Sequence, residues 1–204
     1  APAVLVATGT KERLMSIPGE EKNIGKGISY CAVCDGAFYL DKEIAVIGAG
    51  NSALEEAVYL TQFASKVYII MRRNVFRADK IAVDAAISNP KIEIIQQAVP
   101  IEILDDTTQV TGLKISDVVT KEERTLSLSG IFPYIGADPV TDFLKPLNVL
   151  DEHGYIIVND TMETKIPLLY GAGDVRQKHL RQVVTAVNDG AIAAQDAFHK
   201  IKNL

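Results

Sequence analysis

The sequence predicts an α/β fold with a parallel sheet of the nucleotide-binding type, an antiparallel meander and part of a second nucleotide-binding domain. Three observations lead to this prediction. Segments rich in Val and Ile alternate with amphipathic segments over residues 43–95, which is typical of strands joined by helices in a parallel sheet. A glycine-rich turn at Gly48-Ala49-Gly50 joins the first of these strands to a helix. Short segments separated by polar turns fill residues 98–128, and this pattern predicts antiparallel strands.

The expected elements follow the apolar periodicity of each segment. In chain order they are strands over 4–7 and 43–48, a helix over 51–64, a strand over 66–71, a helix over 78–88, a strand over 91–95, the meander over 98–128, a strand over 168–174 and a helix from about 181 to 202. The first helix has an apolar side of Leu54, Ala57, Val58 and Leu60. The last helix is expected to bury the residues at helical spacing, which are Val183, Val187, Ala191, Ala194 and Phe198.

Composition excludes several classes of protein. Apolar residues make up 48% of the 204-residue chain, as in an ordinary globular core. The longest apolar stretches are too short to span a bilayer. The net charge of −5 gives no broad basic field for nucleic acid. With two cysteines, the chain is not a disulfide-stapled secreted scaffold. We therefore expect a soluble, cytoplasmic protein that binds neither nucleic acid nor a membrane.

The glycine turn has the context of a dinucleotide-binding fingerprint, because it lies between a predicted strand and a predicted helix. Gly48 permits the tight turn, Gly50 lets the backbone approach a pyrophosphate at the helix N-terminus, and Ala53 is the small residue where helix and strand meet. Asn51 and Ser52 complete the predicted turn. A plain strand-to-helix turn is the alternative interpretation.

The residues after the next strand indicate which nucleotide is bound. An NAD site has an acidic residue about twenty positions after the fingerprint, whereas this chain has Arg72, Arg73 and Arg77 in "MRRNVFRA". Guanidinium groups match a phosphate, so the expected cofactor is NADPH. A solvated basic turn is the alternative.

Both cysteines lie in "CAVCD", with Asp35 directly after the second. A zinc site needs about four ligands, and the three histidines are scattered far downstream. A purely structural disulfide would close a very small loop, which stabilises little. Reversible thiol chemistry at Cys31 and Cys34 remains, with Asp35 as a possible proton donor or acceptor. Capping or charging a helix start is the alternative role of Asp35.

Four motifs together, "SYCAVCDG", "GAGNSALEEA", "MRRNVFRA" and "GAGDVRQKHLRQVVTAVNDGAIAA", resemble the low-molecular-weight, bacterial-type thioredoxin reductases of the pyridine nucleotide disulfide oxidoreductase family. The resemblance implies a homodimer that contains FAD and uses NADPH to reduce thioredoxin or a similar protein. It implies that Cys34 faces the flavin, Cys31 attacks the partner, and Asp35 is the acid and base. It also places cofactor-binding residues outside the glycine turn, namely Thr8, Gly9, Gly171, Ala172, Gly173, Asp174, Arg181, Gln182 and Val183.

Two departures from the family pattern stand out. Met71 replaces the usual His before the paired arginines, and no second glycine fingerprint for the ADP half of FAD occurs in the sequence. We therefore expect an N-terminally truncated chain, with a crossover strand of the FAD domain over 1–13, an NADPH domain over 14–137 and the C-terminal part of the FAD domain over 138–204. The alternatives are the flavoprotein subunit of an alkyl hydroperoxide reductase, which generally prefers NADH, and a redox-silent nucleotide-binding fragment.

Overall fold

The computed structural model describes residues 1–203, which divide into two compact units. One unit contains Ala1–Arg13 and the chain from Ala137 onward, and the other contains Leu14–Gly136. The fold is α/β, with parallel sheets and one three-stranded antiparallel sheet.

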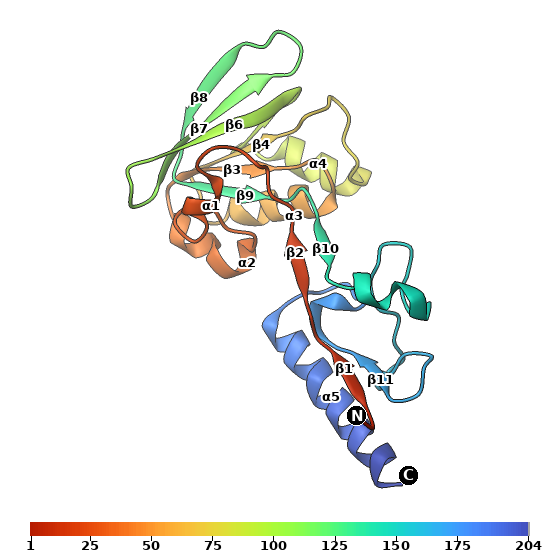
Figure 1. Cartoon of the computed structure of the whole chain (residues 1–204). Helices are drawn as coiled ribbons and strands as arrows, with labels where there is room; N and C mark the ends of the chain where they lie inside the picture. Colours follow the sequence, from red (N-terminus) through yellow and green to blue (C-terminus); the bar gives the residue numbers. More distant parts are fainter. Residues whose placement is uncertain (204) are drawn as a thin grey trace. The chain divides into compact units, whose positions relative to one another are not determined.

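The unit over 14–136 has three layers (Figure 1). Its central parallel sheet has the strand order β5 (Ile92–Ile95), β4 (Lys66–Ile70), β3 (Glu43–Ile47) and β9 (Gly130–Pro133). Helices α3 (Asn51–Leu60) and α4 (Lys80–Ser88) cover one face. The antiparallel strands β6 (Ala98–Asp105), β7 (Val110–Asp117) and β8 (Glu123–Ser127) cover the other. The short helices α1 (Glu20–Asn23), α2 (Ala32–Asp35) and η1 (Gly36–Tyr39) precede β3.

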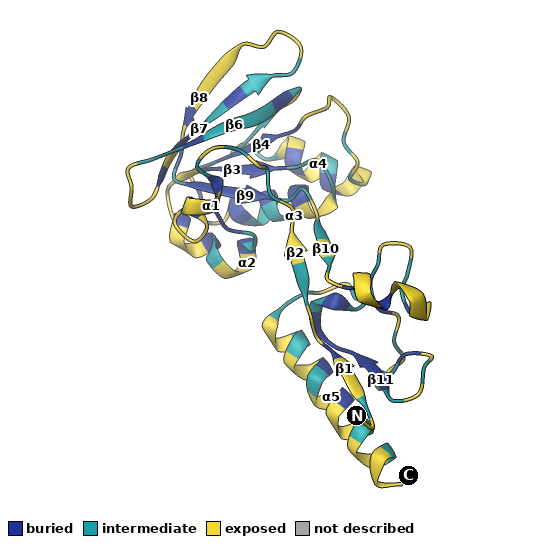
Figure 2. Ribbon diagram, in the orientation of Figure 1, coloured by how far each residue is buried: buried dark blue, intermediate teal, exposed yellow. Residues whose placement is uncertain are grey.

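Side chains alternate between the two faces of a strand. Because a layer covers each face of the central sheet, both faces of its inner strands are buried. In β3, Ile44 and Val46 pack with the helices, whereas Ala45 and Ile47 pack with the antiparallel layer. Figure 2 shows most of β3, β4 and β9 in the dark blue of buried residues, whereas the edge strand β5 is half-buried. Two separate hydrophobic cores therefore fix the sheet, and its carboxyl edge carries the glycine turn.

The other unit contains two short strand pairs and one long helix. Strand β1 (Val4–Val6) pairs in parallel with β11 (Leu169–Gly171), and β2 (Thr10–Glu12) pairs antiparallel with β10 (Ala137–Pro139). The short helices are η2 (Asp142–Leu147) and η3 (Gly173–Val175), and the long helix is α5 (Val183–Lys202). The first residues of the chain thus complete a unit formed mainly by its last third.

Several predicted boundaries are corrected by local hydrogen bonds. The helix predicted over 51–64 ends at Leu60, because the backbone amides of residues 61–63 bond carbonyl groups three residues earlier. The helix predicted from 78 begins at Lys80, where the Asp79 side chain caps it by accepting from the Ala82 amide. The strand predicted over 168–174 ends at Gly171. Strand β9, which was not predicted from the sequence, pairs with β3 as the fourth parallel strand.

The predicted buried face of the last helix is wrong. Among the described residues, α5 packs through Asp189 and Ala193, supported by Ala186, Ile192 and Ala197. The residues predicted to be buried are exposed; they are Val183, Val187, Ala191, Ala194 and Phe198. Burial of the charged Asp189 determines which side of α5 faces its own unit.

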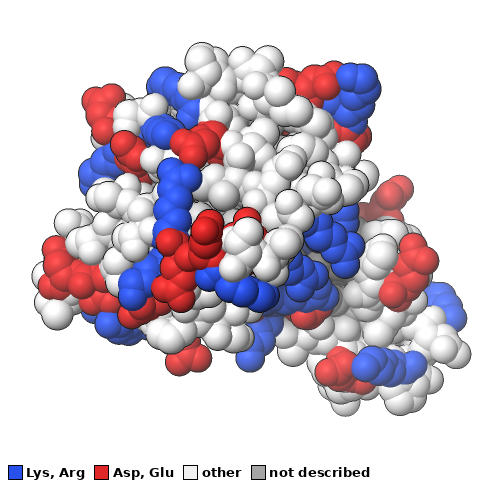
Figure 3. All heavy atoms as spheres, turned by 90° about the horizontal axis from the view of Figure 1, so that it is seen from above, with Lys and Arg blue, Asp and Glu red and all other residues white. Residues whose placement is uncertain are grey.

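No helix within residues 1–203 combines the length and apolar character needed to cross a membrane. On the face shown in Figure 3, Lys and Arg side chains lie among Asp and Glu side chains.

Candidate functional site

Cys31 and Cys34 form a disulfide at the start of α2, with their Cα atoms 5.3 Å apart. Cys31 is the N-cap residue of this short helix, and its sulfur accepts a hydrogen bond from the Cys34 amide at 3.1 Å. Cys34 is exposed, whereas Cys31 is half-buried. The helical turn thus holds the two sulfurs together and presents Cys34 to solvent.

The cysteine segment is fixed to helix α3 by its two small residues. Ala32, between the cysteines, is buried in the same core as Ala53 and Leu60. A Cβ at Gly36 would lie 3.1 Å from the Leu60 side chain and 3.3 Å from that of Phe63, so a larger residue would require these side chains to shift by a few tenths of an ångström. Because α3 begins at the glycine turn, one helix connects the disulfide to the predicted nucleotide site.

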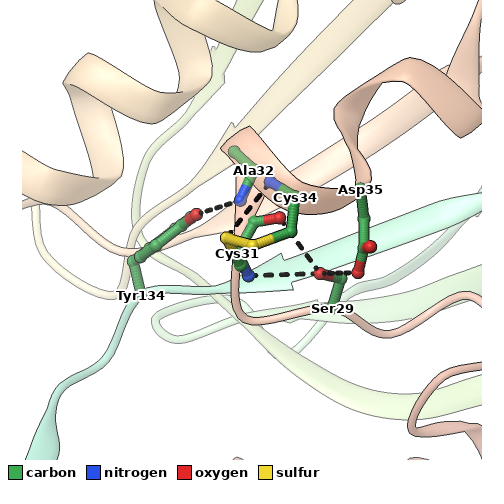
Figure 4. The surroundings of a disulfide bond; sticks show 6 residues. All are labelled: Ser29, Cys31, Ala32, Cys34, Asp35 and Tyr134. Atoms are coloured by element: carbon green, nitrogen blue, oxygen red, sulfur yellow. Dashed lines mark hydrogen bonds between the residues drawn. A yellow bond between two sulfur atoms is a disulfide. The ribbon is translucent and has the colours of Figure 1, made fainter. Parts of the chain in front are cut away.

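Ser29 joins Asp35 to Cys31 (Figure 4). The Ser29 hydroxyl donates to Asp35 Oδ2 at 2.6 Å and accepts from the Cys31 amide at 3.1 Å. Ser29 is buried and Asp35 half-buried. Burial raises the pKa of the neighbouring Tyr39, and the charge of Asp35 raises it further. The Asp35 carboxylate is therefore linked to the disulfide segment through Ser29. Ser29 lies in the motif "SYCAVCDG" but was not predicted to be a site residue.

Tyr134 contacts the disulfide segment from the other side (Figure 4). Its hydroxyl accepts from the Ala32 amide at 2.9 Å, while its own amide donates to the Ile47 carbonyl at 2.8 Å. The sequence carries no signal for this residue, because it lies 102 positions from Ala32.

The glycine turn has room for a ligand at one glycine only. Gly48 has φ +150°, and a Cβ there would lie 2.6 Å from the Tyr134 carbonyl oxygen and 2.9 Å from the Ala53 Cβ. A Cβ at Gly50 would meet no atom within 4 Å. Gly48 and the buried Ala53 therefore serve packing, and the open space at Gly50 fits a pyrophosphate at the start of α3. Asn51 and Ser52 are exposed beside it.

The three predicted arginines lie in the loop between β4 and α4, which is bonded to the glycine turn. The amides of Arg77 and Ala78 donate to the Ala49 carbonyl at 2.9 and 3.2 Å. Arg72, Arg73 and Arg77 are exposed, and within residues 1–203 their side chains have no hydrogen bond or ion pair. Three unpaired positive charges next to the glycine turn fit an additional phosphate group.

A second group of predicted residues lies in the other unit, at the turn after β11. Gly173 has φ +80°, and Asp174 Oδ1 is buried without a hydrogen-bond partner in the described part of the chain. Arg181 Nε donates to the Asp174 carbonyl at 3.3 Å, and its guanidinium group lies 4.3 Å above the Tyr155 ring. Gln182 caps α5, and Val183 begins it exposed. A buried carboxylate oxygen without a donor fits a hydroxyl group of a bound cofactor.

Asp189 holds this turn from α5, a role that the sequence analysis missed. Its carboxylate accepts from the Gly173 amide at 3.1 Å, from Arg176 Nε and Nη2 at 2.7 and 2.8 Å, and from Lys178 Nζ at 2.7 Å. Burial raises the pKa of Asp189, but the hydrogen bonds from Arg176, Lys178 and Gly173 outweigh it and lower the pKa to about 2. The Gly173–Asp174 turn is therefore fixed by a buried charge network.

Thr8 and Gly9 lie in the same unit, between β1 and β2. The Thr8 hydroxyl donates to the Val140 carbonyl at 2.7 Å, and the Gly9 carbonyl accepts from the Val140 amide at 3.0 Å. Their contacts in the structure are thus with the chain leaving β10.

The site residues of the unit over 14–136 are a disulfide, an acid bonded to its segment, and a glycine turn with open space at Gly50. This combination can accept an electron pair at the disulfide and supply a proton next to it. No cluster of His, Cys, Asp or Glu suited to a metal ion occurs within the described residues.

Comparison with known proteins gives one family. Residues 1–190 match the pyridine nucleotide-disulphide oxidoreductase family. The chain is similar to a thioredoxin reductase of Bacillus subtilis (strain 168), with 45% identity. The match covers 100% of this chain and 65% of the relative. It is also similar in structure to thioredoxin reductase from Streptococcus pyogenes MGAS5005, with 46% identity, a TM-score of 0.95, and coverage of 99% of this chain and 66% of that chain. For Lactococcus lactis thioredoxin reductase in its FR conformation the identity is again 46%, the TM-score 0.72 and the coverage 99% and 67%.

The chain spans 65% of the length of the Bacillus subtilis relative.

Proposed function

Because the chain belongs to the pyridine nucleotide-disulphide oxidoreductase family, we propose that it acts as an NADPH-dependent, FAD-containing reductase of thioredoxin or a similar protein. The observation that carries the proposal is the shared helix α3, which begins at the glycine turn and packs against the Cys31–Cys34 segment. The similarity to relatives named thioredoxin reductase supports it.

NADPH binding is assigned to the unit over 14–136. The open space at Gly50 and the amides at the start of α3 would receive the pyrophosphate. Arg72, Arg73 and Arg77, which have no carboxylate partner in residues 1–203, would receive the 2′-phosphate. This charge pattern favours NADPH over NADH.

FAD binding is assigned to the turn after β11 and the start of α5. The unpartnered Asp174 Oδ1 supports a hydrogen bond from a ribityl hydroxyl, and Arg181, Gln182 and Val183 would line the ring system. In domain terms, residues 14–137 would form the NADPH domain, and residues 1–13 and 138–204 would contribute to the FAD domain.

The reaction adds two electrons and two protons to the disulfide. When bound, the two cofactors would supply the electron pair, as a hydride from NADPH that reaches the sulfurs through FAD. The Cys31–Cys34 bond then breaks and two S–H bonds form, one with the proton of the hydride equivalent and one with a proton from solvent. Asp35, held by Ser29, would transfer the solvent proton. Cys31, after losing its proton, would then attack the partner disulfide, as the family resemblance implies, forming a mixed disulfide and releasing one partner thiol. Cys34 would break the mixed disulfide, which restores the Cys31–Cys34 bond and releases the second partner thiol.

A protein partner is supported by exposed apolar side chains in the cysteine segment. The side chains of Val33, Phe38 and Leu40 have exposed fractions of 56%, 73% and 61%. They belong to the same segment of the chain as the cysteine pair. Exposed apolar side chains in the segment that carries the disulfide suit docking of a folded disulfide protein. A homodimer in the cytoplasm completes the proposal.

Steady-state turnover of the intact native polypeptide tests this function. We expect thioredoxin-dependent oxidation of NADPH with a kcat/KM far above that for NADH, and a flavin absorption spectrum. A strong preference for NADH would instead favour the alkyl hydroperoxide reductase subunit. A Cys31–Cys34 disulfide that NADPH never reduces would favour the redox-silent nucleotide-binding protein.

A further inference from the structure

Asn51 connects the glycine turn to the arginine loop, which is the segment over residues 72–79. Its side-chain Oδ1 accepts a hydrogen bond from the Asp79 amide at 2.8 Å. Asn51 is the first residue of α3, and Asp79 is the N-cap of α4. This single bond therefore joins the start of α3 to the start of α4, where the loop ends.

The remaining bonds between the turn and the loop involve only backbone atoms. The Ala49 carbonyl accepts from the amides of Arg77 and Ala78, and those bonds do not depend on which side chains the turn carries. The Asn51 bond is different because it requires an acceptor on a side chain of suitable length. It is the contact through which the sequence of the turn can set the position of the loop.

The other end of the loop is fixed by the sheet. The Met71 amide donates to the Ile95 carbonyl at 2.9 Å, in line with strand pairing. Between this anchor and Asp79 the loop carries Arg72, Arg73 and Arg77, whose guanidinium groups are exposed and unpaired within the described chain. No ion pair in that part of the molecule holds the three groups in place.

We propose that Asn51 is a positioning residue for nucleotide specificity: its hydrogen bond to Asp79 holds the arginine loop where the guanidinium groups meet a 2′-phosphate. The inference rests on the proposed use of NADPH and adds a residue that sets the preference. Loss of the bond removes the side-chain contact among the three hydrogen bonds that hold this end of the loop to the glycine turn. The loop then has more freedom, and the free energy of ordering it is subtracted from the 2′-phosphate interaction. The pyrophosphate interaction with the start of α3 does not require the loop.

The test is calorimetric titration of the intact native polypeptide with ADP-ribose and with 2′-phospho-ADP-ribose. In the parent protein, the 2′-phosphorylated ligand should bind more tightly. In Asn51→Ala, the dissociation constant of ADP-ribose divided by that of 2′-phospho-ADP-ribose should fall about fivefold, which is the effect of one ordinary hydrogen bond. Asn51→Ser, whose hydroxyl lies one bond closer to the backbone than Asn51 Oδ1, gives the same comparison should the alanine variant not fold.

Asn89→Ala is the matched control. Asn89 lies at the other end of α4, where its side chain bonds Thr61 Oγ1 at 3.1 Å and the Lys91 amide at 3.0 Å. This variant loses bonds of the same kind at a distance from the loop, so its ligand ratio should equal that of the parent.

Two results overturn the inference, and they are distinguishable. An Asn51 variant that binds both ligands more weakly by the same factor shows that Asn51 contributes to binding in general and not to specificity. A parent protein without preference for the 2′-phosphorylated ligand removes the proposed use of NADPH, and the inference with it.

Discussion

At the residue scale, the proposed proton transfer depends on how Asp35 is held. Its carboxylate has a short hydrogen bond from a buried serine, and the same serine accepts from the Cys31 amide. One hydroxyl group therefore sets both the acid and the backbone of a redox cysteine. An acid that turned freely would spend less time in the geometry that proton transfer needs.

Replacement of Ser29 by Ala should lower turnover without weakening partner binding. We expect kcat to fall about tenfold, a part of the effect of general acid catalysis, while KM for thioredoxin stays within about twofold because the exposed side chains around Cys34 are unchanged. Steady-state kinetics of the intact polypeptide measure both. Ser29→Thr restores the hydroxyl and should recover most of the rate. An unchanged kcat in Ser29→Ala would contradict this role.

Neither Ser29 nor Tyr134 was singled out from the sequence, and the reasons differ. Ser29 is close to the cysteines in sequence, but a serine there carries no chemical signal until its partners are known. Tyr134 reaches Ala32 across 102 positions, which no local pattern shows. In contrast, the disulfide of Cys31 and Cys34 follows from their spacing, because one helical turn brings the two positions together.

At the scale of elements, the glycine turn separates a packing position from a ligand position. A Cβ at Gly48 would meet the backbone of Tyr134, the residue directly after β9, whereas a Cβ at Gly50 would lie in open space. The two glycines should therefore respond differently to the same substitution.

Gly48→Ala should destabilise the protein by about 1–3 kcal/mol, because the added Cβ meets the Tyr134 carbonyl in a backbone conformation that favours glycine. Gly50→Ala should change the stability by at most about 1 kcal/mol, yet weaken NADP⁺ binding at least tenfold, since the methyl group occupies the pyrophosphate space. Urea unfolding and calorimetric titration measure the two effects. Equal NADP⁺ affinity in Gly50→Ala and the parent would remove the turn from the nucleotide site.

The Asp189 network gives the unit of α5 a pH-dependent stability. The pKa of this carboxyl falls from 3.8 to about 2 on folding. A lowered pKa stabilises the folded state above the unfolded value, and the contribution of about 2 kcal/mol is lost as the pH falls from about 4 to about 2.

Asp189→Asn should therefore be less stable than the parent near neutral pH, and the difference should shrink below pH about 4. Urea unfolding of the intact polypeptide from pH 6 to the acid range measures it, as an order of magnitude. Asp142→Asn, at a side chain that is 92% exposed, controls for the loss of one surface charge. A stability difference that stays constant over the whole range would contradict the ion-pair account.

Three strands of the central sheet, β3, β4 and β5, were predictable, but β9 and the orientation of α5 were not. In β3, the residues over 44–47 are all apolar, which is typical of a strand buried on both faces, and both faces are buried in the structure. In α5, apolar residues line one side at helical spacing, but the opposite side carries Asp189 with its two cationic partners. The pairing of a buried acid with Arg176 and Lys178 is a tertiary property that periodicity does not report.

At the scale of the whole molecule, the chain order does not match the order in space. Residues 1–13 join the unit formed by the last third, through pairing of β1 with β11 and of β2 with β10. The disulfide, the glycine turn and the arginine loop all belong to the other unit. The proposed electron acceptor and the proposed NADPH site therefore share one folded unit.

The most direct test counts thiols after addition of NADPH. The intact native polypeptide is incubated anaerobically with NADPH, alkylated, and digested for mass spectrometry. The account predicts that Cys31 and Cys34 are alkylated after NADPH is added and remain unmodified in its absence, with a two-electron stoichiometry. A disulfide that dithiothreitol reduces but NADPH leaves intact, in protein shown to contain flavin, would contradict it.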